Sequence, residues 1–364
     1  MNKKIRVGIL FGGKSAEHEV SLQSAKNVYD AIDRDKYDPV LIGIDKRGRW
    51  ILNDASRFLL NADDPKHISL NTAGEAVALI PQSGGALSNP GSLKSGQQID
   101  VVFPILHGPF GEDGTVQGLL KLADLPFVGA SVLGSAVGMD KDVMKRLLRD
   151  SGIPIARFIA LKSHEKPTPF GTAVESLGLP MFVKPANMGS SVGVSKVHDE
   201  GEYAAALAAA FRYDTKIIIE EFVKGREIEC AVLGNEAPEA SVPGEVISTH
   251  EFYSYDAKYI DENGAALEIP AKLPADTAER IRKLAVESFR ALSCEGLGRI
   301  DFFLKENGEI LVNEINTMPG FTKISMYPKL WEASGLSYTA LIDRLITLAM
   351  ERYEKESRLN TDYS

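Results

Sequence analysis

Cysteine is scarce in this sequence, which has only Cys230 and Cys294 among 364 residues. Two cysteines without metal-like spacing support neither a disulfide framework nor a zinc site, and they suit a reducing compartment. A long apolar segment is also missing at the N-terminus, where the run from Ile5 to Phe11 is too short for a secretory signal or a membrane span. We therefore expect a cytoplasmic protein that has no membrane partner.

A surplus of positive charge is absent as well. Lysine and arginine total 41 against 50 aspartates and glutamates, which gives a formal net charge of −9. Binding of nucleic acid needs clustered lysines and arginines, so we expect no nucleic-acid partner and instead a small molecule. The 44% hydrophobic and 25% charged residues are typical of a soluble globular protein, and the length predicts two or three domains.

The first part of the chain alternates strand and helix signals. Apolar strand-like runs at residues 5–11, 39–44 and 101–106 accompany a helical segment at residues 21–32. Such alternation is typical of a parallel sheet with helices on both faces. Residues 82–98 are rich in glycine and serine, and we expect a polar surface loop there, within an insertion from about residue 45 to residue 98.

A second unit is expected to begin where Asp140 can cap a helix from Lys141 to Asp150, which Gly152 and Pro154 would end. Strands are predicted in it at residues 157–161, 181–184 and 216–221, with a helix at residues 202–211. A third unit is predicted to hold a strand at residues 228–233, a hairpin, and helices at residues 278–292 and 338–353.

The hairpin is predicted by Asn307-Gly308, which lies between two alternating apolar runs. An Asn-Gly pair in this context favours a two-residue type I′ turn, because both central residues of that turn need a positive φ. The resulting register pairs Glu306 with Glu309, Phe303 with Val312, Asp301 with Glu314, and Arg299 with Asn316. The strand period of two then places those last four residues on one face and Ile300, Phe302, Leu304, Leu311 and Ile315 on the other.

Directly opposed carboxylates repel each other, so a positive group is expected between Asp301 and Glu314. Asn316 adds a third oxygen donor to the same face, and oxygen ligands without histidine or cysteine suit Mg²⁺ bound to substrate phosphates. We interpret this face as a metal and nucleotide platform. The alternative is a solvated sheet face on which Arg299 relieves the charges.

Residues 8–15 match the phosphate-loop pattern G-x-x-x-x-G-K-[ST] in every letter. The match lacks its structural context, because residues 9–11 complete an apolar strand where a phosphate loop needs accessible backbone N–H groups. Residues 16–19 also place acids before the helix, where the phosphate would have to lie.

A better phosphate-binding candidate is the segment of residues 184–194. Lys184 ends a predicted strand there, and the Gly/Ser loop after it offers backbone N–H groups and two hydroxyls to phosphate oxygens. A flexible turn with a solvated lysine is the alternative. Glu220 and Glu221 end a further strand, where they are either adenine and ribose acceptors or simply solvated acids.

Taken in order, seven segments resemble the motifs of the D-alanine–D-alanine ligases of the ATP-grasp superfamily, and the resemblance covers nearly the whole chain. These segments are residues 12–21, 106–114, 139–141, 184–193, 252–259, 298–301 and 313–320. The resemblance implies a mixed α/β (α+β) fold: an N-terminal doubly wound parallel-sheet domain, then a two-domain ATP-grasp fold with antiparallel sheets that hold ATP between them. The domains implied are residues 1–139, 140–225 and 226–364, and the chain is implied to form a homodimer.

The reaction that the resemblance implies is the ATP-dependent joining of two D-alanines to D-alanyl-D-alanine for peptidoglycan precursor synthesis. ATP would phosphorylate the carboxylate of the first D-alanine, and the amine of the second would attack this acyl phosphate through a tetrahedral intermediate, leaving ADP and phosphate. Two Mg²⁺ or Mn²⁺ ions would be bound by Asp301, Glu314 and Asn316.

The resemblance also assigns the other site residues. Glu17, which would bind the ammonium of the first D-alanine, matches a hydrogen-bonded triad with Ser190 and Tyr259, and Arg299 matches the residue that stabilises the carboxylate and then the oxyanion. The remaining substrate-side matches are His107, Gly320, Ser325 and Met326. The ATP-side matches are Lys141, Lys184, Glu220, Glu221, Val223, Glu227 and Lys258.

Several of these assignments have alternatives. Glu17 is also placed to favour a helix dipole, and His107 is either catalytic or structural. Some relatives carry lysine at the position of Glu221, where the backbone N–H and C=O could contact adenine in place of the side chain. The segment of residues 252–259 resembles the family's lid loop, in which Lys258 reaches the γ-phosphate and Tyr259 helps to exclude water; aromatic packing on a hairpin is the alternative. Relatives that join D-alanine to D-lactate carry phenylalanine where Tyr259 stands, so the tyrosine favours a dipeptide product.

Two other functions stay open at this point, a phosphate-loop NTPase centred on Lys14 and a non-catalytic nucleotide-binding or sensing module. We expect Lys184→Ala to weaken ATP binding by roughly tenfold or more, because it removes a charged contact to phosphate, and Lys14→Ala to leave it unchanged. Titration calorimetry with ATP measures both. Loss of binding in Lys14→Ala alone would favour the NTPase.

Overall fold

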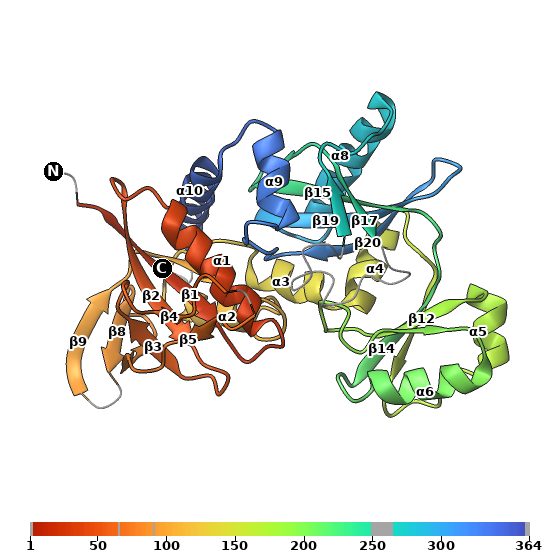
Figure 1. The fold of residues 1–364 in the computed structure, drawn as a ribbon, viewed down its shortest axis with the longest axis horizontal. Helices are drawn as coiled ribbons and strands as arrows, with labels where there is room; N and C mark the ends of the chain where they lie inside the picture. Colours follow the sequence, from red (N-terminus) through yellow and green to blue (C-terminus); the bar gives the residue numbers. More distant parts are fainter. Residues whose placement is uncertain (1–2, 65, 90–91, 249–264, 361–364) are drawn as a thin grey trace.

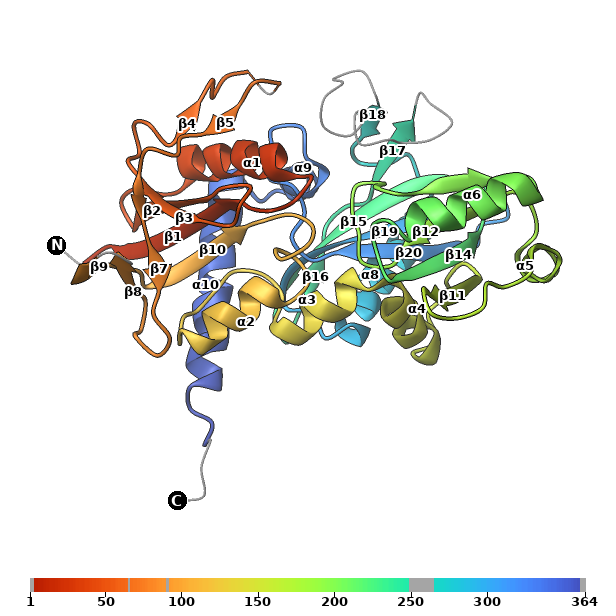
Figure 2. The ribbon, with the colours of Figure 1, turned by 90° about the horizontal axis from the view of Figure 1, so that it is seen from below.

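The structure is a computed structural model that describes residues 3–64, 66–89, 92–248 and 265–360. Its three largest sheets, each with its helices, lie side by side along the long axis of the molecule (Figure 1). The sheet formed by the C-terminal part of the chain lies between the other two in both views (Figure 1, Figure 2). Among the described residues, no helix combines the length and the apolar character that crossing a membrane requires.

The N-terminal sheet has the strand order β10-β1-β2-β3-β6. Its strands are β1 (Ile5–Gly12), β2 (Tyr37–Ile44), β3 (Trp50–Asn53), β6 (Glu75–Ala76) and β10 (Val101–Ile105). The three strands β10, β1 and β2 pair in parallel, as predicted, whereas β3 and β6 are antiparallel additions. One face packs on α1 (His18–Ala31) and the other on α2 (Thr115–Leu122), which explains why β1 is buried on both sides.

The prediction of a loop at residues 82–98 is wrong. Strands β7 (Ala78–Leu79), β8 (Ala86–Asn89) and β9 (Ser92–Gln98) form a small antiparallel sheet there, and β4 (Leu59–Leu60) and β5 (Ser69–Leu70) form another pair. Of the glycines that suggested a loop, Gly84 and Gly85 lie in the turn before β8. Gly85 has φ of +94°, and a Cβ on it would lie 2.0 Å from the carbonyl oxygen of Ile99.

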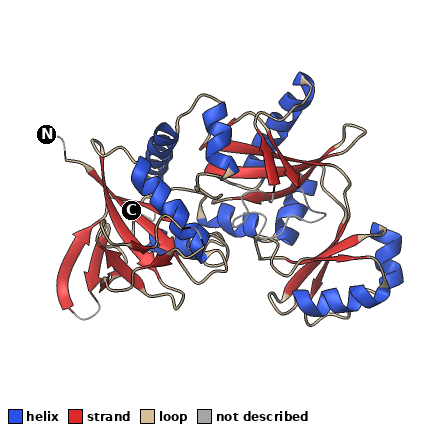
Figure 3. Cartoon of the chain, in the orientation of Figure 1, coloured by secondary structure: helices blue, strands red, loops and turns tan. Residues whose placement is uncertain are grey.

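The second sheet has the order β11-β14-β12-β13, and all its neighbours are antiparallel, as expected. Its strands are β11 (Phe158–Lys162), β12 (Met181–Pro185), β13 (Ser195–Val197) and β14 (Lys216–Glu221). Helices α5 (Phe170–Leu177) and α6 (Glu200–Ala210) cover one face, where Val183 and Ile219 belong to the core (Figure 3). Lys184 and Glu220 are the next residues along the same strands, so they belong to the opposite face.

The third sheet is antiparallel and has the order β18-β17-β15-β19-β20. Its strands are β15 (Arg226–Gly234), β17 (Gly244–Ser248), β18 (Ala265–Glu268), β19 (Gly296–Leu304) and β20 (Ile310–Asn316), and β16 (Glu239–Ala240) pairs with β15. Helix α8 (Ala275–Ala291) packs on one face, where α3 (Val132–Met139) and α4 (Lys141–Asp150) also contribute to the core. Helices α9 (Met326–Ala333) and α10 (Tyr338–Glu356) join the other face to the N-terminal sheet in one continuous core.

The predicted type I′ turn of the β19–β20 hairpin is wrong. Gly308 has φ of +82°, but Asn307 does not have a positive φ. The backbone N–H of Gly308 donates to Lys305 O at 2.9 Å, and the N–H of Lys305 donates to Glu309 O at 2.9 Å. The loop therefore has three residues with glycine in the left-handed position, which shifts the pairs next to it by one residue.

A β-bulge restores the predicted register at the acid pair. Phe302 pairs with Val312 but Asp301 pairs with Glu314, so Asn313 is an extra residue in β20. The predicted Glu306–Glu309 and Phe303–Val312 pairs are wrong, and Phe303 faces Leu311, while Asp301–Glu314 and Arg299–Asn316 are confirmed. On the apolar face, the core contains Ile310 and Val312 in place of the predicted Leu311.

Gly308→Ala should lower the free energy of unfolding by about 1–2 kcal/mol, because alanine must enter the left-handed region. The loss is conformational, since a Cβ on Gly308 would meet nothing within 4 Å. Gly118→Ala, in the interior of α2 with equally open space, is the matched control and should raise stability by roughly 0.5–1 kcal/mol. Urea denaturation measures both, and two changes of the same sign would contradict the assignment.

Candidate functional site

Several of the residues that the sequence singled out gather where the polar face of the β19–β20 hairpin meets α4 and the loop of residues 187–194. Lys141 at the start of α4 has its Nζ 3.6 Å from Glu314 Oε2 and donates to Met188 O at 2.7 Å. Ser190 in the same loop donates to Glu17 Oε1, which comes from the start of α1. The site is thus built from all three main parts of the fold.

Arg299 and Asp301 form the first half of the hairpin's polar face. The guanidinium of Arg299 donates to both carboxylate oxygens of Asp301, at 2.8 and 2.7 Å, and its Nε lies 2.8 Å from Glu229 Oε2. Asn316 donates to Asp301 Oδ2 at 3.0 Å. The sequence reasoning missed Glu229, although an acid in the apolar run of residues 228–233 was a signal, and its strand neighbour is Asp301.

The two opposed acids have different cationic neighbours, since Arg299 lies against Asp301 and Lys141 lies near Glu314. Among the described residues there is no group of three or more His, Cys, Asp or Glu side chains that could hold a metal ion. The predicted set consists of two carboxylates and one amide, which are adjacent on one face and each partly exposed. These are hard oxygen donors, so their chemistry fits Mg²⁺ or Mn²⁺.

Lys184 and Glu220 form an ion pair on the inner side of the second sheet. Lys184 Nζ lies 2.5 Å from Glu220 Oε2, and Lys145 of α4 contacts the other oxygen of the same carboxylate. Burial by itself raises the pKa of Glu220, but the two lysines hold it below its ordinary value. Lys145 carried no sequence signal, because a lysine inside a helix is usually solvated.

The remaining residues assigned to the ATP side lie near the end of β14 and the start of β15. The side chain of Glu221 accepts from the backbone N–H and the Nε of Arg157, both at 2.7 Å. Val223 is half-buried in the connection, and Glu227 is exposed at the start of β15. Lys258 and Tyr259, with the rest of the expected lid loop, lie outside the described residues.

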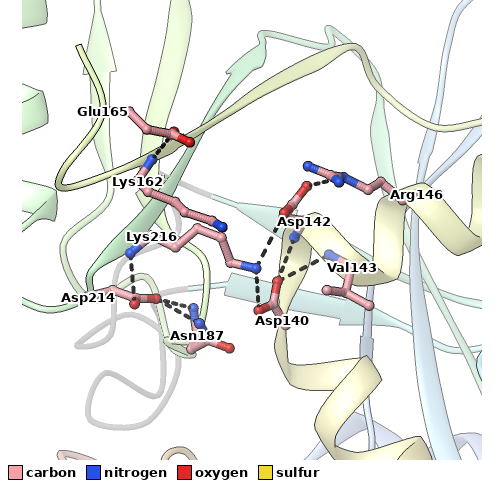
Figure 4. Close-up of polar contacts among 9 residues, drawn as sticks. All are labelled: Asp140, Asp142, Val143, Arg146, Lys162, Glu165, Asn187, Asp214 and Lys216. Carbon is pink, nitrogen blue, oxygen red and sulfur yellow. Dashed lines mark hydrogen bonds and ion pairs between the residues drawn. The ribbon is translucent and has the colours of Figure 1, made fainter. Parts of the chain in front are cut away.

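A polar cluster connects the start of α4 to the second sheet (Figure 4). Asp140 caps the helix by accepting from the N–H groups of Asp142 and Val143, both at 3.1 Å, which confirms the predicted cap. Lys216 Nζ lies 2.6 Å from Asp140 Oδ2 and 3.3 Å from Asp142 Oδ2. Asp214, two residues before Lys216, accepts from Asn187, so the cluster fixes Lys141 relative to the loop that carries Ser190.

Glu17 is nearly buried, and two glycines allow other segments to approach it. A Cβ on Gly108, which has φ of +72°, would lie 2.7 Å from Glu17 Oε2, and one on Gly189 would lie 3.3 Å away. The helix does not use Glu17 as a side-chain cap. Its carboxylate faces the loops at residues 108 and 189–190, which fits a binding role better than a purely helical one.

His107 is buried, and both of its ring nitrogens have protein partners. Nδ1 lies 3.0 Å from Met318 O, and Nε2 lies 3.3 Å from Ser24 Oγ. Burial lowers the pKa of His107, which favours a neutral ring that donates to Met318 and accepts from Ser24. This geometry supports the structural alternative, in which His107 connects α1 to the loop of residues 317–321.

Glu112 connects the same two loops and was missed by the sequence reasoning. Its carboxylate accepts from the backbone N–H of Gly108 at 2.7 Å and of Met318 at 3.1 Å. The bridge holds the segment that leads to Gly320, which lies so close to Ser325 that a Cβ on the glycine would be 2.7 Å from Oγ. Met326 follows Ser325 as the first residue of α9 and is buried.

The phosphate-loop pattern at residues 8–15 lacks the required loop in the structure. Residues up to Gly12 belong to β1, and α1 begins only at His18. Gly12 donates its backbone N–H to Ser21 Oγ at 2.7 Å, and Lys14 lies over the ring of Phe110, 5.5 Å from its centroid. This segment connects the sheet to α1, which agrees with the sequence-based rejection of a phosphate loop.

Comparisons with known proteins find two matching family profiles. One, described as D-ala D-ala ligase N-terminus, matches residues 6–130, and the other, described as D-ala D-ala ligase C-terminus, matches residues 147–347. The D-alanine–D-alanine ligase of Oceanobacillus iheyensis is 58% identical over 366 residues, covering 99% of each chain. The D-alanine–D-alanine ligase A of Escherichia coli is 55% identical over 363 residues, again with 99% of each chain covered.

Solved structures of ligases are similar to nearly the whole chain. The D-alanine-D-alanine ligase from Coxiella burnetii has a TM-score of 0.86 and 39% identity, covering 98% of this chain and 96% of its own. The D-Ala:D-Ser ligase VanG from Enterococcus faecalis has a TM-score of 0.84 and 35% identity, covering 95% and 100%. The D-alanine–D-alanine ligase from Bacillus anthracis complexed with ATP has a TM-score of 0.72 and 28% identity, covering 97% and 99%.

Glu112 should make stability depend on pH. Burial and then the charge of Glu17 raise the pKa of Glu112 from an ordinary 4.5 to about 8. The folded protein therefore retains a proton that the unfolded chain releases, so the stabilisation is complete below about pH 4.5 and is lost as the pH rises to about 8. Glu112→Gln removes this titration. Its free energy of unfolding relative to that of the parent should therefore rise between pH 5 and pH 8.5, by up to about 1.4 kcal/mol per pH unit.

Urea denaturation at several pH values measures this difference. Glu332→Gln, which changes an exposed acid of α9, is the control and should follow the parent at every pH. A stability difference between Glu112→Gln and the parent that does not change with pH would contradict the prediction.

Proposed function

The chain belongs to the D-alanine–D-alanine ligase family, and from this premise we propose that it joins two D-alanines through an acyl phosphate, releasing ADP and phosphate. It is an enzyme of the ligase class, and its small-molecule substrates include ATP, as one solved relative was crystallised with that nucleotide. The product, D-alanyl-D-alanine, would serve peptidoglycan precursor synthesis. The proposal includes a cytoplasmic location, which the scarcity of cysteine favours, and a homodimer, which the family resemblance implies.

The observation that carries the proposal is the convergence of acids and lysines from the three main parts of the fold on one site. Lys141 lies beside Glu314, Lys184 lies beside Glu220, and Glu17 accepts from Ser190. In the proposal, Lys141 and Lys184 bind the phosphates of ATP, and Glu17 binds the ammonium of the first D-alanine. A nucleotide and an amino acid can then meet because the loop of residues 187–194 contacts both sides.

Asp301, Glu314 and Asn316 would hold two Mg²⁺ or Mn²⁺ ions, which offset negative charge on the transferring phosphoryl group when bound. Their oxygens are of the right kind and adjacent across the β19–β20 pair. Glu220, Glu221, Val223 and Glu227 would line the adenine and ribose, with the Glu221 contribution restricted to its backbone because Arg157 engages its side chain.

Arg299 is proposed to bind the carboxylate of the first D-alanine and then the oxyanion of the tetrahedral intermediate. Glu229 and Asp301 hold its guanidinium on the site's face, so the charge is oriented before the substrate arrives.

The second D-alanine would be surrounded by Gly320, Ser325 and Met326, and His107 and Glu112 position that segment. In the expected lid loop, Lys258 is proposed to reach the γ-phosphate and Tyr259 to close over the site and exclude water from the acyl phosphate.

The division into residues 1–139, 140–225 and 226–364 is part of the same proposal. The first boundary falls at Asp140, where α3 ends and α4 begins. Gly225 lies directly before β15 and supports the second.

A coupled assay tests the function directly. With ATP, Mg²⁺ and D-alanine, we expect ADP to appear in step with D-alanyl-D-alanine, and little product with L-alanine or with D-lactate as the second substrate. D-Serine is included because a relative of similar fold is a D-Ala:D-Ser ligase. Product with D-serine but not with D-alanine would change the proposed specificity, and absence of ADP release under all conditions would favour a binding or sensing module.

A further inference from the structure

Lys145 is a buried lysine that no step of the proposed reaction uses. It lies on α4 one turn after Lys141, and its side chain is 0% exposed. Its ammonium contacts Glu220 Oε1, whereas Lys184 Nζ lies 2.5 Å from Glu220 Oε2. One carboxylate of the second sheet therefore serves two lysines, one on each oxygen.

The two lysines differ in their access to the site. The side chain of Lys184 is 13% exposed, while those of Lys145 and Glu220 are 0% and 3% exposed. A ligand can reach Lys184 from the site but cannot reach Lys145, which is enclosed by α4 and the sheet. Lys145 is thus placed to act on Glu220 and not on a substrate.

The charges of the cluster explain why a second lysine is present. Burial lowers the pKa of Lys145, although the negative charge of Glu220 acts in the opposite direction. Burial acts on Lys184 in the same direction, but Glu220 and Glu314 together hold the pKa of Lys184 above its ordinary value. Three lysines, with Lys141, face the two acids Glu220 and Glu314, which leaves one positive charge for a phosphate ligand.

We propose that Lys145 is a positioning residue for Lys184: it neutralises Glu220 from α4, so that the Lys184 ammonium can leave this acid for the oxygens of a bound triphosphate. The inference rests on the proposed function of the site as an ATP site. A nearly buried carboxylate is stable only with a cationic partner, so without Lys145 the acid would retain Lys184 as its counter-ion. The nucleotide would then lose a contact without any change in a residue that touches it.

Lys145→Met tests the proposal, because methionine keeps a long unbranched side chain and removes the charge. We expect its Kd for ATP, measured by calorimetry with Mg²⁺ and without D-alanine, to rise roughly tenfold or more. The KM for D-alanine should stay within about twofold of the parent value, because the ion pair that the described residues give Lys145 is with Glu220 on the nucleotide side. An ATP Kd equal to that of the parent would overturn the proposal.

The double variant Lys145→Met/Glu220→Gln separates positioning from a merely structural role. Methionine and glutamine replace the buried ion pair with neutral side chains, which buried sites often tolerate, and Lys184 is no longer retained by Glu220. Glu220→Gln alone is its reference, because that variant already contains any change on the adenine side. We expect the double variant to bind ATP as tightly as Glu220→Gln, since Lys145 acts on the nucleotide only through Glu220. A double variant that binds ATP clearly more weakly than Glu220→Gln would overturn the proposal, and this comparison remains decisive if Lys145→Met alone does not fold.

Arg352→Met is the matched control. Arg352 is a buried cation of α10 that donates to Gly129 O and Phe127 O, at 2.7 and 2.8 Å, away from the site. Its loss should lower the unfolding temperature and leave the ATP Kd unchanged. The parent is assayed in the same series: a parent that makes no dipeptide contradicts the proposed function, whereas an active parent with an unaffected Lys145→Met contradicts only this inference.

Discussion

The site depends on the antiparallel pairing of β19 with β20, which places Asp301 directly opposite Glu314. Carboxylates on directly opposed strand residues repel each other, and the surrounding structure supplies positive charge from both sides. Arg299 comes from the same strand as Asp301, and Lys141 comes from the start of α4. Because the sheet fixes the acids, the other elements of the site are arranged around them.

Helix α4 connects the β19–β20 hairpin to the second sheet. It carries Lys141 at its first residue and Lys145 one turn later, and Lys216 holds its N-cap. These three lysines bind acids on different elements, which gives the helix a defined position between the β19–β20 hairpin and β14. The loop that carries Ser190 is held by the same cluster through Asp214 and Asn187, so the nucleotide side and the amino-acid side of the site share one support.

The sequence predicted local features well where one physical rule dominates. The cap at Asp140, the limits of α4 and β14, and the parallel centre of the first sheet follow from capping chemistry and apolar periodicity. It failed where composition was ambiguous, as in the small sheet at residues 78–98, where Gly84 and Gly85 form a turn between two strands. Glu112 and Lys145 were missed because their partners come from distant segments, which no local pattern reveals. Glu229 was marked as an acid within an apolar run, but its strand neighbour Asp301 is also distant in the sequence.

The extra residue Asn313 separates the hairpin's tip from its base. A longer loop displaces every pair near the tip by one step, and the bulge displaces the strand back by one step before the acids are reached. The two irregularities offset each other, so the register at the acid pair is the one that a two-residue turn without a bulge would give. The loop of the hairpin can therefore adopt its own turn conformation, while Glu314 and Asn316 remain paired with Asp301 and Arg299.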